Sequence, residues 1–206
     1  MVKHGLYKIT ESADISGEVA RGKMGFKKDQ FILLFFGIIT KYKGLDLLLD
    51  AFSRLESGLP GIRLLIAGRV SQEYLNEFNT LINSYSSPKI TAITRHVNEE
   101  EIELLFKASD VVVLPYTEAS QSGVLFMSYA FGKPVIAPAL GGFPSDIEPS
   151  KTGLLFKPFS SESLAETIRE YHENWNSDSS YIREFAQRNY SWDSSAECIV
   201  NIYEQV

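Results

Sequence analysis

Short apolar runs of strand length alternate with amphipathic stretches of helix length from residue 31 onward. Most of the apolar runs are continuous, which is typical of strands covered by helices on both faces. We predict strands at residues 31–37, 62–67, 90–94, 111–115, 134–137 and 153–156, and helices at 45–55, 72–84, 99–108, 123–131, 161–175, 181–189 and 193–204. This alternation predicts a Rossmann-like, doubly wound α/β fold with a mostly parallel sheet of about six strands.

Composition narrows the class of protein. The chain has 206 residues, a formal net charge of -6 and a single cysteine, Cys198. One cysteine excludes an internal disulfide framework and a cysteine-cluster zinc site. The negative charge argues against nucleic acid as a partner. The longest apolar run, residues 31–39, is too short to span a membrane, and the first residues lack an apolar signal segment, so a cytoplasmic location is expected.

Residues 1–30, here called the lead-in, are polar and irregular, with one short helix expected around residues 18–24. The predicted domain then covers residues 31–206. In an open α/β sheet, ligands bind outside the carboxyl ends of the strands, where helices begin. The loops after the strands are therefore the candidate sites.

The loop after the first predicted strand contains Gly37, Lys41 and Lys43. Lysines beside glycines at the start of a helix can hold an anionic group through backbone amides and ammonium charge. The loop lacks the Walker and the Gly-x-Gly-x-x-Gly patterns of other phosphate sites. A solvated loop with ordinary lysines is the alternative.

The loop after the fourth predicted strand contains Glu118, Ser120, Gln121, Ser122 and Gly123. Hydroxyl, amide and backbone donors gather here at the positive end of a helix, and the carboxylate could bind substrate hydroxyls. Helix capping by Ser120 or Ser122 is the alternative, although capping would require only one serine.

Arg69 and His96 follow the second and third predicted strands and add polar side chains at the same edge of the sheet. His96 could stack on a base or cap a helix, and a lone histidine of this kind is more often structural. Spacings typical of metal ligands or of a serine–histidine–acid triad do not occur in the sequence.

Five segments, in this order along the chain, resemble the C-terminal domain of glycosyltransferase family 4. They are FFGIITKYKGLDLLLDAF at residues 35–52, ASDVVVLPY at 108–116, FGKPVIA at 131–137, GGFP at 141–144 and TGLLF at 152–156. The resemblance covers nearly the whole chain. These motifs are common to the family and do not select a nucleotide base, a sugar or an acceptor.

The resemblance implies the C-terminal half of a GT-B fold, in which two Rossmann-like domains face each other across a cleft. Family members transfer a hexose from a nucleotide-sugar, such as a UDP-sugar, to an acceptor with retention of anomeric configuration and without an essential metal. The C-terminal domain holds the donor, and an N-terminal domain supplies the acceptor site. The lead-in would then be the interdomain linker, residues 31–206 the donor-binding domain, and the chain alone would not complete turnover.

The resemblance also assigns roles to individual residues. Lys43 matches the lysine of the family's diphosphate-binding loop, and the amides of Ser122 and Gly123 would face the diphosphate or the sugar. Two positions depart from the family pattern. Ile38 stands where an arginine is common, and Met127 stands where the second glutamate of the family's Glu-x7-Glu motif is expected. The first glutamate position is Ala119, so Glu118, the candidate catalytic residue, would replace it only through a shift of one residue.

These departures leave a second hypothesis open, a degenerate domain of the same fold that binds a partner without turnover. A flavodoxin-like nucleotide-binding domain is disfavoured because the usual phosphate motifs are absent from the sequence. The last predicted helix, residues 193–204, resembles the family's helix that crosses to the other domain. Without that domain, its apolar face would favour self-association. Relatives that glycosylate lipids contact membranes peripherally, and the sequence leaves such contact open.

Overall fold

The computed structural model describes residues 5–192 except 10, 13, 119, 120 and 176, together with residues 196 and 200. Cys198 and nearly all of the helix predicted at 193–204 lie outside the described residues, so self-association through that helix stays a prediction. No described helix is long and apolar enough to cross a membrane.

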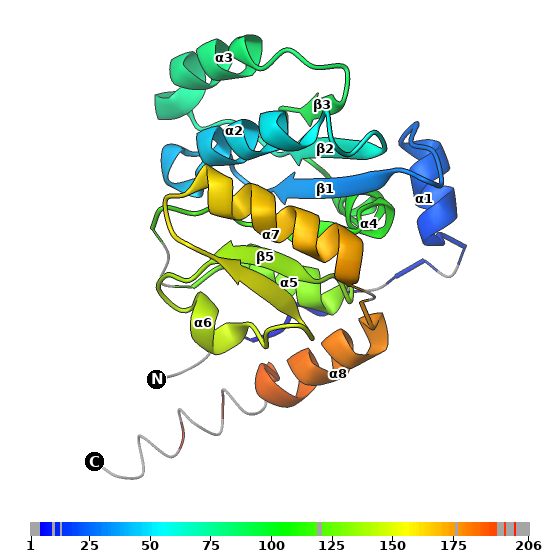
Figure 1. The fold of residues 1–206 in the computed structure, drawn as a ribbon. Helices are drawn as coiled ribbons and strands as arrows, with labels where there is room; N and C mark the ends of the chain where they lie inside the picture. The colour runs from blue at the N-terminus through cyan, green and yellow to red at the C-terminus, as the bar shows by residue number, and fades with distance from the viewer. Residues whose placement is uncertain are drawn as a thin grey trace.

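The core of the molecule is one parallel sheet with the strand order β3-β2-β1-β4-β5-β6 (Figure 1). The strands are β1 (Phe31–Phe36), β2 (Ile62–Ala67), β3 (Ile90–Ile93), β4 (Val111–Val113), β5 (Val135–Pro138) and β6 (Gly153–Phe156). The six predicted strands are confirmed to within two residues at each end. The predicted Rossmann-like fold is therefore confirmed, and within the described strands the sheet is wholly parallel.

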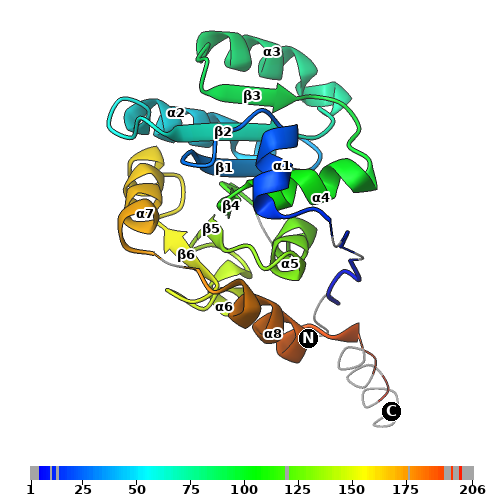
Figure 2. The ribbon, with the colours of Figure 1, turned by 90° about the vertical axis from the view of Figure 1, so that its right-hand side faces the viewer.

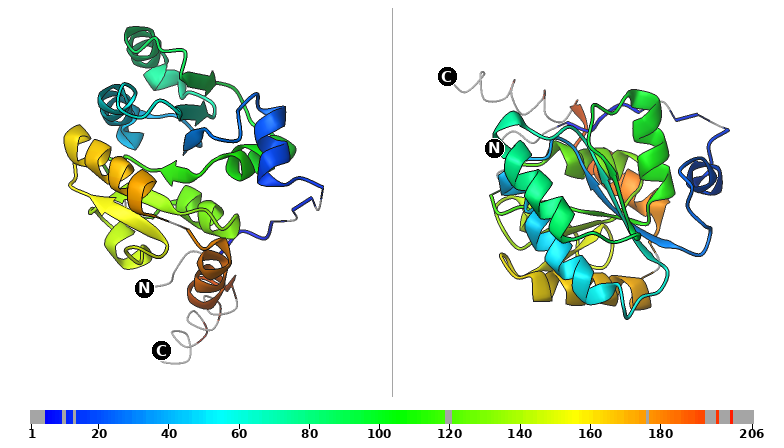
Figure 3. Two further views of the ribbon diagram at one scale, coloured as in Figure 1. Left: turned by 45° about the vertical axis from the view of Figure 1, so that its right-hand side comes forward. Right: turned by 90° about the horizontal axis from the view of Figure 1, so that it is seen from above.

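Helices cover both faces of the sheet, as the continuous apolar strands required. The larger helices are α2 (Leu45–Leu55), α3 (Leu75–Ser84), α4 (Glu99–Ala108), α5 (Gly123–Ala130), α7 (Ser161–Asn174) and α8 (Ser179–Asn189). Helices α2, α3 and α7 lie on one face of the sheet, and α4, α5 and α8 lie on the other (Figure 3). Their buried side chains form two core layers, one on each face. Along β1, Leu33 and Phe35 enter the first layer, whereas Leu34 and Phe36 enter the second. Both faces of the central strand are thus removed from water.

Local sequence explains where several helices begin and end. Asn98 accepts a hydrogen bond from the amide of Glu101, whose side chain accepts one from the amide of Asn98, and this capping box starts α4. Gly132, with φ +66°, follows α5 and allows the left-handed turn that ends it. The helix predicted from residue 72 instead begins with a 3₁₀ turn at Gln72–Tyr74, and α3 follows that turn.

The described part of the lead-in packs against the domain. Its helix α1 (Gly17–Lys23) lies beside α4 (Figure 2). A short helix outside the lead-in, α6 (Phe143–Asp146), follows β5 and lies near α8. The guanidinium of Arg21 pairs with the carboxylate of Asp110 at 2.6 Å, which joins α1 to the start of β4. Whether residues 1–30 link two domains stays a prediction.

Candidate functional site

The strand order places the direction change of the fold between β1 and β4, which are neighbours at the centre of the sheet. From β1 the chain continues outward to β2 and β3, whereas from β4 it continues outward to β5 and β6. Ligands of doubly wound folds bind at this switch point, outside the carboxyl ends of the two strands. The two loops singled out in the sequence follow these two strands, so the fold brings them together.

Direct hydrogen bonds hold the two loops side by side. Thr117, after β4, donates from its backbone amide and from its hydroxyl to the carbonyl oxygen of Tyr42, after β1, at 2.8 and 3.1 Å. The rings of Tyr42 and Tyr116 meet edge to face, with their centroids 5.9 Å apart. The relative position of the loops is thereby fixed by backbone contacts as well as by side-chain packing.

Lys43 is the central charged group of the site. Its side chain is only 6% exposed, and its ammonium makes no hydrogen bond or ion pair with any residue that the structure describes. Burial lowers the pKa of Lys43 from 10.5 to about 8. The ring centroid of Tyr116 lies 5.6 Å from Nζ. A buried ammonium without a counter-charge is costly, and a bound anion would compensate for that cost.

Gly37 makes room for this ammonium. A Cβ at Gly37 would lie 2.7 Å from Nζ of Lys43 and 3.3 Å from a methyl group of Val124, and its φ of +104° also favours glycine. A larger residue would therefore displace the lysine from its position. Gly37, predicted as part of an anion-binding loop, therefore contributes by leaving space for the side chain of Lys43.

The first turn of α5 faces Lys43 across the site. Ser122 caps this helix by accepting a hydrogen bond from the amide of Leu125 at 3.3 Å, and its hydroxyl donates to the hydroxyl of Tyr116 at 3.4 Å. The capping role weighed for Ser122 in the sequence is therefore confirmed. Amide groups at the start of a helix carry partial positive charge, so both sides of the site favour an anion.

A hollow of about 200 Å³ lies between these groups. Five of the predicted site residues line it: Gly37, Lys43, Gln121, Ser122 and Gly123. The rest of the lining includes Tyr7, Ile38, Tyr42, Tyr116, Val124 and Met127. The positions that depart from the family pattern, Ile38 and Met127, thus lie in the same hollow as Lys43.

Two other predicted residues belong to a neighbouring hollow of about 570 Å³ between the β1 loop and the start of α3. Lys41 and Glu118 both line it, and Tyr42 separates it from the hollow around Lys43 because it lines both. The ammonium of Lys41 is exposed and pairs with the carboxylate of Glu77 at 3.1 Å. The catalytic role suggested for Glu118 stays a prediction.

The remaining predicted residues lie farther out. Arg69 and His96 are exposed at the ends of β2 and β3, and neither lines either hollow. The carbonyl of Arg69 accepts a hydrogen bond from the amide of Ile39 at 2.8 Å, which ties the β2 loop to the β1 loop. Ser120 lies outside the described residues. In the part of the chain that the structure describes, no three metal-ligating side chains gather into a metal site, and independence from metal stays a prediction.

Sequence reasoning missed three aromatic residues of the site, Tyr7, Tyr42 and Tyr116. Tyr116 is buried, which raises the pKa of its hydroxyl, and it lies between Lys43 and Ser122. Tyr7 enters the hollow from the lead-in, more than a hundred residues from α5 in sequence. Tyr116 stands in a matched motif and could have been singled out there. No local pattern marks Tyr7.

Comparison with known proteins settles the family. A family model described as Glycosyl transferases group 1 matches residues 17–188, which is most of the chain. The chain belongs to the group 1 glycosyl transferases. The resemblance found in the sequence motifs is therefore confirmed, and the match reaches into the lead-in as far as α1.

Relatives of this group 1 chain are longer than it is. A D-inositol 3-phosphate glycosyltransferase of Mycobacteroides abscessus is 29% identical over 188 residues, which are 89% of this chain and 41% of that protein. The next two relatives of the same name are covered to 46% and 36% of their lengths. The chain thus spans less than half the length of the curated relatives it matches.

Solved structures confirm the fold of this group 1 chain. The structure of Anabaena HepE in complex with UDP-glucose superposes with a TM-score of 0.79 at 21% identity, covering 96% of this chain and 54% of that one. The C-terminal domain of a group 1 family protein from Francisella tularensis gives a TM-score of 0.66 at 22% identity, covering 92% of each chain. The match to a separate C-terminal domain agrees with the predicted half of a GT-B fold.

Proposed function

We propose that this chain is the donor-binding half of a retaining glycosyltransferase that transfers a hexose from a nucleotide-sugar. One observation carries the proposal: the buried ammonium of Lys43, without a polar partner among the described residues, faces the first turn of α5 at the switch point of the sheet. Such a pair of positive groups fits a diphosphate. During transfer, it would stabilise the negative charge that grows on the departing nucleoside diphosphate.

The proposed ligand is a nucleotide-sugar, because the chain belongs to a family of glycosyl transferases and shares the fold of a structure solved with such a donor. Anabaena HepE, which shares the fold, was solved with UDP-glucose, and this supports a UDP-sugar as the first donor to test. Retention of configuration and independence from metal come from the family resemblance and belong to the same proposal.

Transfer would need more than this chain. Catalysis requires donor and acceptor to be held together in one geometry, and the relatives are more than twice as long as the matched region in the three cases above. We therefore propose that an N-terminal acceptor-binding domain completes the active site and that the present chain binds a donor without turning it over.

Calorimetry with UDP-glucose, GDP-glucose and ADP-glucose tests the proposal. We expect one of them to bind, and we expect Lys43→Met to weaken that binding by about tenfold or more because a charge-assisted contact to phosphate is lost. Lys28→Met is the matched control, since Lys28 is an exposed lysine whose ammonium pairs with the exposed Glu18. Failure of all three donors to bind at millimolar concentration would exclude the proposal, as would unchanged binding by Lys43→Met.

A degenerate, partner-binding domain is the second candidate, and one observation favours it. Ile38 is 51% exposed in the hollow around Lys43, and Met127 lines the same hollow, at the two places where the family resemblance leads one to expect an arginine and a glutamate. The two candidates differ in turnover. Donor hydrolysis or transfer by this chain joined to its N-terminal half would reject the degenerate domain, and donor binding without either reaction would support it.

A further inference from the structure

The described lead-in residues 5–9, 11, 12 and 14–16, here called the strap, cross the outside of the domain between α5, α8 and α4 (Figure 2). One end of the strap is fixed by backbone contacts. The amide of Leu6 donates to the carbonyl of Tyr190 at 2.6 Å, and the indole N–H of Trp192 donates to the carbonyl of Leu6 at 2.8 Å. The strap is therefore held against the segment that follows α8.

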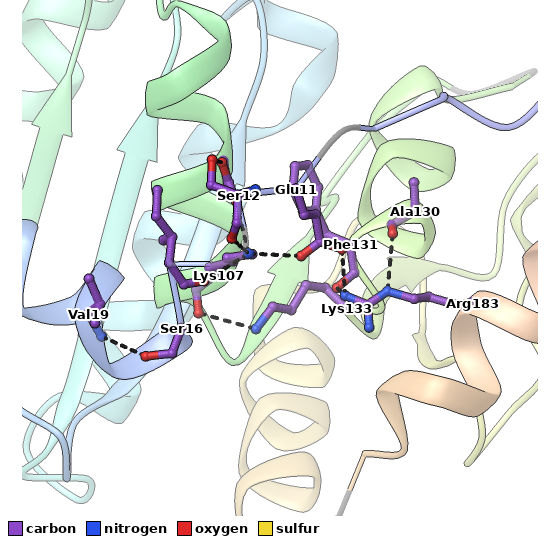
Figure 4. A network of polar contacts seen from close by, with 11 residues as sticks. Glu11, Ser12, Ser16, Val19, Lys107, Ala130, Phe131, Lys133 and Arg183 are labelled. Carbon is purple, nitrogen blue, oxygen red and sulfur yellow. Dashed lines mark hydrogen bonds and ion pairs between the residues drawn. The ribbon is translucent and has the colours of Figure 1, made fainter.

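The other end of the strap is fixed by charge. The carboxylate of Glu11 pairs with the ammonium of Lys107 on α4 and with the guanidinium of Arg183 on α8, each at 3.0 Å (Figure 4). Next to it, the amide and hydroxyl of Ser12 donate to the carboxylate of Glu103 at 2.8 and 3.0 Å. Lys107 is only 14% exposed, so this anchor is more protected from solvent than an ordinary surface ion pair.

Tyr7 lies between these two anchors and reaches the candidate donor site. Its hydroxyl oxygen would lie only 2.9 Å from a Cβ built on Gly123, the first residue of α5, and Tyr7 lines the hollow that contains Lys43. The side chain of Tyr7 is 40% exposed, so packing in the core does not explain its position. The two anchors bring a phenol hydroxyl to the place where the helix start and the lysine both favour an anion.

We propose that Tyr7 is a donor-contact residue whose hydroxyl donates a hydrogen bond to a diphosphate oxygen of the bound nucleotide-sugar. This inference rests on the proposed function, and it adds a donor group from outside the predicted loops. A phenol O–H is a good donor to an anionic oxygen, and such charge-assisted hydrogen bonds are stronger than neutral ones. Glu11 is then a positioning residue, because it holds the strap that carries Tyr7.

The main test compares Tyr7→Phe with the wild type, using whichever of UDP, GDP and ADP the wild type binds most tightly and the corresponding sugar nucleotide. We expect both ligands to bind about tenfold or more weakly, because a hydrogen bond to a charged group is lost while the ring is kept. Tyr85→Phe is the control, since Tyr85 lies at the end of α3 in the other core layer. We expect it to bind within twofold of the wild type. Unchanged binding by Tyr7→Phe overturns the inference, and so does a loss confined to the sugar nucleotide.

A double-mutant cycle tests the anchor. Glu11→Gln removes the charge that attracts Lys107 and Arg183, and we expect it to weaken nucleotide binding in the wild type but to have little further effect in Tyr7→Phe. A purely structural role would lower the melting temperature without this coupling. Equal, additive losses in both backgrounds would overturn the positioning role of Glu11.

Lys43→Met separates this inference from the proposed function. Suppose that the wild type binds a nucleotide, that Lys43→Met abolishes this binding and that Tyr7→Phe leaves it unchanged. In that case only the inference on Tyr7 fails. If the wild type binds no nucleotide, the proposed function fails and the inference fails with it.

Discussion

Gly44 lies so close to Pro115 that a Cβ on Gly44 would come within 2.0 Å of the carbonyl oxygen of Pro115. Gly44 ends the 3₁₀ turn that contains Lys43 and begins α2, with φ +66°, and Pro115 follows β4. The contact joins the two loops of the candidate site. The close approach requires a residue without a side chain, so glycine at this position sets the distance between Lys43 and the β4 loop.

Substitution of Gly44 by alanine should loosen both the fold and the site. The new methyl group meets backbone atoms that cannot rotate away, and the left-handed conformation is strained for alanine. We expect the free energy of unfolding to fall by on the order of 2–3 kcal/mol, measured by urea denaturation. Donor affinity should fall as well, measured by calorimetry on the folded protein.

Gly22→Ala is the matched control for this change. Gly22 lies in the helix α1, its φ is not positive, and a Cβ built there meets no atom within 4 Å. Alanine should therefore stabilise the protein slightly, by roughly 0.5–1 kcal/mol. Equal effects of the two substitutions would show that the contact between Gly44 and Pro115 does not constrain the loops.

Asp110 should be important for stability although it lies far from the candidate site. Its carboxylate pairs with Arg21 at 2.6 Å and accepts a hydrogen bond from the amide of Ile32 at 2.7 Å, so it joins α1, β1 and β4. Asp110→Ala removes the acceptor of the Ile32 amide and the carboxylate that pairs with Arg21, whose guanidinium keeps only its bonds to backbone carbonyls. We expect a loss of on the order of 2–4 kcal/mol in chemical denaturation. Donor affinity measured well below the melting temperature should stay within twofold.

Lys28→Ala gives the contrasting case, because the pair between Lys28 and Glu18 is 80% and 69% exposed. Exposed pairs contribute little, so the expected loss is below about 0.5 kcal/mol. A loss as large as that of Asp110→Ala would contradict the view that burial and the additional acceptor contacts distinguish the two pairs.

The periodicity of the sequence was sufficient to predict the fold. Continuous apolar strands such as β1 and β4, separated by amphipathic helices, leave few arrangements other than a parallel sheet covered on both faces. Among the described elements, the short helix α6 and the 3₁₀ turn at Lys41–Lys43 were not predicted, and the other differences lie at element ends. For example, β4 ends at Val113 instead of the predicted residue 115: the amide of Leu114 still donates to the carbonyl of Ile136 on β5, but Pro115 cannot donate a ladder hydrogen bond.

The candidate site was predictable only in part. Gly37, Lys43, Ser122 and Gly123 could be placed from the rule that ligands gather at the carboxyl ends of strands, and they do share one hollow. Whether a lysine points into that hollow depends on side-chain packing, so loop position alone did not distinguish Lys41 from Lys43, and only the family resemblance singled out Lys43. Tyr7 could not be found at all, because its position depends on contacts that Leu6 and Glu11 make with residues far along the chain, such as Tyr190 and Arg183.

The hollow around Lys43 offers a test of the departure at Met127. The family resemblance implies that a glutamate at this position would accept hydrogen bonds from the ribose hydroxyls of the donor. We expect Met127→Glu to bind the sugar nucleotide severalfold more tightly, measured by calorimetry, because a carboxylate is a strong acceptor for hydroxyl groups. Met127→Gln is the control that supplies an uncharged acceptor, and we expect a smaller gain. Weaker binding by both variants would argue that this domain has lost the ribose contact altogether.

The pH dependence of Lys43 provides two opposite signals. Burial lowers its pKa from 10.5 to about 8, so between these values the unfolded chain carries a proton that the folded chain lacks. Stability without ligand should therefore rise with pH across this window. Burial lowers the pKa of Lys133 to about 8 as well, so the contribution of Lys43 is the difference between the wild type and Lys43→Met.

Donor affinity should change in the other direction. The phosphate needs the charged ammonium, so affinity should fall above pH 8, by up to about tenfold per pH unit, as the free protein loses the proton. Lys43→Arg keeps its charge throughout this range, and its affinity, even if lower, should be independent of pH. Calorimetry at pH 7, 8, 9 and 10 distinguishes the cases. A flat profile in the wild type, or the same slope in Lys43→Arg, would show that another group controls binding and that the ammonium of Lys43 does not contact the phosphate.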